Sequence, residues 1–163
     1  MSQIQTNTLE TNFRNINLTD EILELLFIEY SQAAKSEGLK LSFIKDTENT
    51  NIEGDENTIT QIVANLLNNA IKYTQKGEVI LRVFRTSDNK LAVEVNDTGI
   101  GISKEYLPKI FDSFSQEEQG YTRHYDGNGL GLALVKKYCQ INNAEITVES
   151  EKGKGSTFRV IFK

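Results

Sequence analysis

The sequence predicts an α/β (α+β) two-layer sandwich, with a mixed, mostly antiparallel sheet of about five strands and about three helices on one face. Short segments in which apolar and polar residues alternate, as in strands, are interleaved with longer segments in which apolar residues recur at helical spacing. Elements in this order favour helices layered on one side of a sheet. The 163 residues suffice for one domain with one core.

The composition is that of a soluble globular domain. Hydrophobic residues make up 38% and charged residues 25%, and no apolar run approaches the roughly 20 residues that span a membrane. The net charge of −5, without clusters of Lys and Arg, argues against nucleic-acid binding. The first residues lack the basic and apolar parts of a secretory signal, and the single cysteine, Cys139, fits a reducing compartment. We expect a cytoplasmic chain without membrane contact of its own, whether or not a parent protein is anchored in a membrane.

The amino-terminal stretch is polar and weakly patterned. We therefore expect a linker or disordered tail over residues 1–12 and a domain over 13–163. Residues 13–18 alternate as a strand does. Thr19 is then expected to cap a helix over 22–34, in which apolar residues recur at helical spacing.

An alternating strand at 39–44 leads through a polar turn to a helix at 56–74. One face of this helix is apolar and is made by Ile59, Val63, Leu66, Leu67 and Ala70. The opposite face is polar and carries Gln61, Asn65, Asn68, Asn69 and Lys72. We expect the first face to pack, which leaves the second as a row of amides that ends in a cation.

The remaining elements are two strand hairpins, a short helix that contains or adjoins the only proline, and a helix apolar enough to be buried. In chain order they are expected at 79–84 with 91–95, at 103–114, at 130–141, and at 144–149 with 156–162.

Two glycine clusters bracket the polar loop that follows the first hairpin. Residues 97–102 have the sequence Asp-Thr-Gly-Ile-Gly-Ile, and residues 127–132 have the sequence Gly-Asn-Gly-Leu-Gly-Leu. Glycine permits positive φ and lets another group approach the backbone closely. The pair of clusters therefore indicates a lid, at about 102–127, over an anionic ligand.

Four short motifs resemble the histidine-kinase catalytic and ATP-binding domain, within the gyrase, Hsp90, histidine kinase and MutL superfamily. They are the N box Asn65–Thr74, the first glycine box Asp97–Gly101, the phenylalanine box Phe111–Phe114 and the second glycine box Gly127–Gly131. Their order is that of the family, and the resemblance runs from about residue 15 to the end. It implies the Bergerat ATP-binding fold and the cofactors ATP and Mg²⁺.

The resemblance implies roles for single residues. Asn69 is similar to the asparagine that holds Mg²⁺, and Asn65, one turn earlier, would support the same ion. Lys72 and, in the lid, Arg123 would position the phosphates. The alternative for the amides is a solvated polar face, and for Arg123 a solvated loop cation.

Other predicted ATP contacts lie beyond the amide row. Asp97 is similar to the carboxylate that accepts a hydrogen bond from the adenine amino group, although it could merely start a turn. Tyr73 would contact the nucleotide or serve as a core aromatic, and Thr157 would lie near the adenine unless it is an ordinary strand threonine. The predicted glycine-box contacts are Gly99, Gly101, Ile102, Gly127, Gly129, Leu130 and Gly131. Asn128 departs from the Thr or Ser common in the family.

The residue at position 65 separates the possible reactions. ATP-hydrolysing members of the superfamily usually carry a glutamate four residues before the Mg²⁺ asparagine, and an amide cannot act as a general base there. The only histidine, His124, falls in the predicted lid and lacks the sequence context of a phosphoacceptor. We therefore expect neither a phosphoacceptor nor a general base in this chain.

The expected function is that of the ATP-binding catalytic domain of a two-component sensor histidine kinase. It would position Mg·ATP for γ-phosphoryl transfer to a histidine on a separate dimerisation and phosphoacceptor helical domain of the parent kinase, which is expected to be a homodimer. A response regulator receiver domain would act downstream. The alternatives are a nucleotide-binding regulatory module without phosphoryl transfer and, less favoured because of Asn65, an ATPase clamp.

Overall fold

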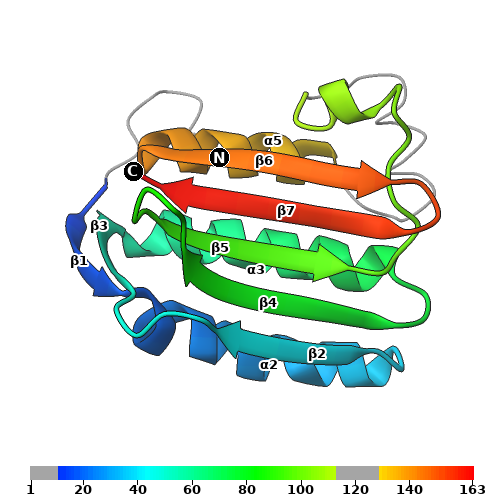
Figure 1. Cartoon of the computed structure of the whole chain (residues 1–163), viewed down its shortest axis with the longest axis horizontal. Helices are drawn as coiled ribbons and strands as arrows, with labels where there is room; N and C mark the ends of the chain where they lie inside the picture. Colours follow the sequence, from blue (N-terminus) through cyan, green and yellow to red (C-terminus); the bar gives the residue numbers. More distant parts are fainter. Residues whose placement is uncertain (1–10, 113–128) are drawn as a thin grey trace.

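The computed structural model describes residues 11–112 and 129–163. Its main sheet has five strands, in agreement with the predicted number, and their order is β2-β4-β5-β7-β6 (Figure 1). Their bounds are β2 Lys40–Lys45, β4 Glu78–Arg85, β5 Leu91–Asp97, β6 Ala144–Glu151 and β7 Gly155–Phe162. Only β2 and β4 run parallel, and each other neighbouring pair is antiparallel.

Three α-helices of the described residues, α2 Glu24–Ser36, α3 Glu56–Tyr73 and α5 Gly129–Ile141, cover one face of this sheet (Figure 1). The expected two-layer sandwich is therefore confirmed. No helix in the described part of the chain is both long enough and apolar enough to cross a membrane.

The core lies between the sheet and the helices. Alternate residues of β4, namely Val79, Leu81 and Val83, are fully buried because the pleat turns them toward the helices. The apolar face predicted for α3 is buried as well, with Leu66 and Leu67 at most 1% exposed. Burial of one such side chain stabilises the fold by about 1.5–3 kcal/mol, so this face holds α3 in place.

The amino-terminal region differs from the prediction. Strand β1 (Phe13–Asn17) does not join the main sheet but pairs antiparallel with β3 (Asn51–Asp55). The sequence analysis placed only a polar turn where β3 lies. This strand has a single large apolar residue, Ile52, and its partner strand rather than its own pattern makes it extended.

Thr19 is not the helix cap. It lies inside a short π-helical turn, Thr19–Leu23, that leads into α2, and its hydroxyl is buried without a hydrogen-bond partner in the described structure. Asn17 does the capping, because its Oδ1 accepts from the N–H of Asp20 at 3.1 Å. Glu21 accepts in return from the N–H of Asn17 at 2.9 Å.

The helix expected at 103–114 is reduced, within the described residues, to the 3₁₀ turn Leu107–Lys109, which contains Pro108. Residues 113–128, which include most of the predicted lid, lie outside the described part of the chain.

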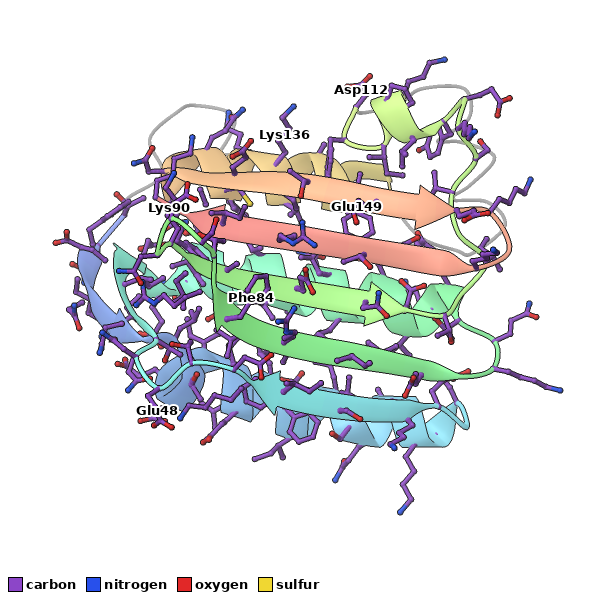
Figure 2. The ribbon with its side chains drawn as sticks, in the orientation of Figure 1. Glu48, Phe84, Lys90, Asp112, Lys136 and Glu149 are labelled. Atoms are coloured by element: carbon purple, nitrogen blue, oxygen red, sulfur yellow. The ribbon has the colours of Figure 1, made fainter. Side chains whose placement is uncertain are left out.

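The sheet face without helices carries a charged row across three strands. Glu94 of β5 accepts from Arg159 Nε of β7 at 2.6 Å and lies 3.6 Å from Arg82 Nη1 of β4. The Arg82 guanidinium in turn lies 4.1 Å from the ring centroid of Phe84, which projects from this face (Figure 2). Cross-strand ion pairs of this kind suit a face that water reaches.

Candidate functional site

The first part of the site is the polar face of α3. Asp55 begins the helix, and its side chain accepts from the N–H of Thr58 at 3.0 Å. Asn65 and Asn69 follow one turn apart and are half-buried, whereas Lys72 is exposed. The amide nitrogen of Asn65 donates to the backbone oxygen of Gln61 at 2.9 Å, so the other end of this amide, its oxygen, is the one that would face a cation.

The second part is Asp97, the last residue of β5. Its side chain is only 6% exposed and its Oδ1 accepts from the N–H of Gly99 at 2.8 Å. Burial raises the pKa of Asp97 to about 6, against hydrogen bonds from the backbone of Gly99 and Ser156 that favour the charged form. A buried carboxylate held in this way is typical of a site that reads a hydrogen-bond donor.

The first glycine box joins α3 to β5. The N–H of Ile100 donates to the backbone oxygen of Tyr73 at 3.2 Å, at the end of α3. A Cβ on Gly99 would lie 2.4 Å from the same oxygen, so only glycine fits there. Tyr73 itself is 8% exposed and belongs to the buried side of the helix. The box therefore fixes the distance between Asp97 and the amide row.

The second half of the box is anchored on the far hairpin. Gly101 has φ +74°, and a Cβ there would lie 2.1 Å from the backbone oxygen of Glu151. The N–H of Ile102 donates to Ser150 Oγ at 2.8 Å, and the Ile102 side chain is buried at 3% exposure. Both predicted contact positions of this half thus lie at the end of the sheet where β5 and β6 finish.

Thr157 lines one pocket with Asp97, where β5 ends and β7 begins. It lies on the sheet face without helices, where Asn96 Nδ2 donates to its hydroxyl. Ser156 pairs with Asp97 across β5 and β7, and directly paired residues point to the same face. A shift of one residue along a strand reverses the face, so Ser156 lies on the same face as Asp97, where its hydroxyl pairs with Ser150 Oγ at 2.8 Å. The buried Phe158, Val160 and Phe162 were the signal that could have identified it.

The second glycine box leads into α5. Gly129, Leu130 and Gly131 form its first turn, while Gly127, Asn128, Arg123 and His124 lie outside the described residues. Helix α5 lies beside α3 on the sheet (Figure 1). The amino-terminal end of a helix attracts anions through its unpaired N–H groups and its dipole.

The phenylalanine box is described only in part. The ring of Phe111 packs edge-on against Phe158 of β7, with centroids 6.2 Å apart. Phe111 thus packs against the hydrophobic core, and Phe114 lies outside the described residues.

The donor set fits Mg²⁺ carried by a nucleotide. Among the described residues there is no group of three or more His, Cys, Asp or Glu side chains that could hold a metal. The amide row offers neutral oxygens instead, and Mg²⁺ commonly takes one or two protein ligands, keeps several waters and binds phosphate oxygens. The site therefore suits a metal ion that arrives with the phosphates.

Comparison with known proteins identifies relatives of the same kind. Hybrid signal transduction histidine kinase L of Dictyostelium discoideum is 38% identical over 169 residues, which cover 100% of this chain and 10% of that protein. The circadian input-output histidine kinase CikA of Thermosynechococcus vestitus is 47% identical over 108 residues, or 66% of this chain and 15% of that protein. The chain thus spans only a small part of these relatives' lengths.

Solved structures agree. Full-length ShkA in complex with AMPPNP matches with a TM-score of 0.79 and 26% identity, over 94% of this chain and 31% of that one. The catalytic domain of the histidine kinase ThkA matches with a TM-score of 0.76 and 25% identity, over 93% of this chain and 95% of that one. Residues 54–163 also match a family model. The chain therefore belongs to the family of histidine kinase-, DNA gyrase B- and HSP90-like ATPases.

Proposed function

We propose that this domain binds Mg·ATP and positions its γ-phosphoryl group for transfer to a histidine on a separate dimerisation and phosphoacceptor domain of a parent sensor kinase. The observation that carries the proposal is the buried Asp97, fixed by the glycine box against the end of α3. The family membership and the histidine kinases among the relatives support it.

The adenine end of the proposed site is built on β5 and β7. Asp97 accepts a hydrogen bond from the adenine amino group, and Ser156 supports it in the role that the sequence analysis gave to Thr157. Gly99, Gly101 and Ile102 form the wall beside the base. A buried carboxylate discriminates well here, because a base without the donor would leave it unpaired.

The phosphate end of the proposed site lies between α3 and α5. Asn69 and Asn65 hold Mg²⁺, which neutralises charge on the phosphates, and Lys72 reaches toward them as an exposed cation. The second glycine box, Gly127 to Gly131, supplies backbone N–H groups before and within the first turn of α5, and Arg123 completes the cation set. Catalysis then consists of positioning and charge neutralisation.

Asn65 favours transfer to histidine over hydrolysis. Its amide is held by the backbone of Gln61 and cannot take a proton from water near neutral pH. A neutral imidazole needs no such base, because its free lone pair attacks directly. The chain then needs a phosphoacceptor from outside itself.

The partners follow from this division of labour. We propose a helical dimerisation and phosphoacceptor domain in a homodimeric parent kinase, and a response regulator receiver domain downstream, consistent with the word hybrid in the name of a relative. We propose that residues 13–163 form the catalytic domain, with 1–12 as a linker or tail, and that the domain works in the cytoplasm.

Two measurements test the proposal. Calorimetry should show that the domain binds ATP. Asp97→Asn should weaken this binding whether or not Mg²⁺ is present, whereas Asn69→Ala should weaken it only when Mg²⁺ is present. Equal binding by both variants and the wild type would refute the site. When the domain is mixed with a dimerisation domain and labelled Mg·ATP, acid-labile label should appear on the phosphoacceptor histidine. Tight ATP binding without label would favour the regulatory module instead.

A further inference from the structure

The side chain of Asn142 joins the end of α5 to the start of α3. Its Oδ1 accepts from the N–H of Asp55 at 2.8 Å, and its Nδ2 donates to Thr58 Oγ1 at 2.8 Å and to the backbone oxygen of Tyr138 at 2.9 Å. The Asn142 side chain is 4% exposed, so these bonds are made away from water. Both amide N–H groups and the amide oxygen are thus engaged, and the bonds to Thr58 and Asp55 span 84 and 87 positions of sequence.

The neighbouring residues leave space for the Asn142 amide and extend its hydrogen bonds. Gly54 leaves room for it, because a Cβ there would lie 3.0 Å from Asn142 Oδ1 and 2.7 Å from Ile59 Cδ1. Thr58 Oγ1 also donates to Asp55 Oδ2 at 2.8 Å, so the residue that caps α3 belongs to the same network. The crossing of α3 and α5 is therefore fixed by directed hydrogen bonds.

The network lies at the opposite end of both helices from the proposed phosphate site. Asn142 follows the last residue of α5, whereas the second glycine box begins that helix, 13 residues earlier. Figure 1 shows the two helices side by side along the sheet. At 1.5 Å per residue the start of α5 is about 20 Å from the joint, so a tilt of about 5° there would move it by about 2 Å.

We propose that Asn142 is a positioning residue for nucleotide binding: it fixes the angle of α5 on α3, so that the first turn of α5 faces the amides that would hold Mg²⁺. This inference rests on the proposed function. The apolar contacts between the helices, through buried residues such as Val135 and Cys139, hold them together but have no strong direction. Hydrogen bonds do have direction, and binding sites in general need their groups held to within about 0.5 Å.

The test separates positioning from stability. Asn142→Ala is compared with Val83→Ala, which removes fully buried volume from β4 and leaves the hydrogen bonds of Asn142 intact. Mg·ATP affinity of the 163-residue chain is measured by calorimetry at a temperature where both variants are folded by circular dichroism. We expect Asn142→Ala to weaken Mg·ATP binding about tenfold and Val83→Ala to change it less than about twofold.

A second pair of variants covers the case in which Asn142→Ala does not fold. Thr58→Val removes one partner of the amide while keeping the shape of the side chain, and Thr58→Ser keeps the hydroxyl. We expect weaker Mg·ATP binding for the first and wild-type binding for the second. Equal affinities for Asn142→Ala and Val83→Ala, or for Thr58→Val and Thr58→Ser, would overturn the inference. Failure of the wild-type chain to bind Mg·ATP would instead contradict the proposed function.

Discussion

Replacing Asp97 by asparagine should make the domain more stable and a worse ATP binder. The pKa of Asp97 is about 6 in the folded protein, against an ordinary value of 3.8, because burial disfavours its charge. Above about pH 6 the carboxylate is ionised in both the folded and the unfolded chain, and the folded chain bears the whole cost of burying the charge. That cost is relieved as the pH falls from about 6 to about 4, where the folded state binds a proton that the unfolded state does not.

The size of the effect follows from the shift. Each pKa unit corresponds to about 1.4 kcal/mol, so the difference of about 2 units amounts to about 3 kcal/mol at the most. Asparagine resembles the protonated acid in shape and lacks the charge. Asp97→Asn should therefore raise the free energy of unfolding by about 1–3 kcal/mol at about pH 8, which is about 2–10 °C in Tm, and by almost nothing at about pH 4.

The assay is urea unfolding of both proteins between about pH 4 and pH 8, followed by circular dichroism. Subtracting the two curves removes the titration of every other carboxylate. Both proteins are also titrated with Mg·ATP. The Mg·ATP affinity of the wild type should fall below about pH 6 more steeply than that of the variant. The pH dependence that the variant retains is due to protonation of the phosphates. If the variant is less stable than the wild type, or if the difference in the free energy of unfolding does not change with pH, the charge of Asp97 is not destabilised by burial and the reasoning is refuted.

Three further changes test the fold. Gly101→Ala, which brings a Cβ against the backbone of Glu151, should lower the free energy of unfolding at least about twice as much as Gly38→Ala. Gly38 is the matched control because it has nearly the same φ with no atom within 4 Å, so equal losses would contradict the clash. Leu67→Ala, at a fully buried position of α3, should cost about 2–5 kcal/mol in urea unfolding. Glu94→Gln should cost about 0.5–1 kcal/mol at low salt, and a loss that persists undiminished at about 1 M NaCl would show that charge is not its cause.

The sequence predicted an element best where apolar residues recur with a regular period and the face they form is buried. Helix α3 was predicted within a residue of its ends, because apolar residues at helical spacing leave one solution for packing. Strand β3 was not predicted, because Asn51, Glu53 and Gly54 give no strand signal and the pairing with β1 comes from tertiary context.

Within the candidate site, the sequence could identify residue types on a strand or helix but not every face. The sequence analysis assigned an adenine contact to Thr157, whereas the alternation of buried residues in β7 places Ser156 on the same face as Asp97. No local pattern in the sequence pointed to Asn142, because its structural role depends on hydrogen bonds with Asp55 and Thr58, more than 80 positions away. Contacts of this range become visible only in three dimensions.

The strand order also determines when the nucleotide site forms during folding. Strands β4 and β5, and likewise β6 and β7, are neighbours in the sequence, whereas β5 meets β7 across pairs such as Asn96 and Thr157, which are 61 positions apart. A pairing that closes so long a loop forms late. Asp97 of β5 and Ser156 of β7 are paired across these two strands, so this part of the site forms only when they pair. We therefore expect Mg·ATP to slow unfolding in stopped-flow experiments and to leave the refolding rate unchanged. The nucleotide would then stabilise the domain only through its unfolding rate.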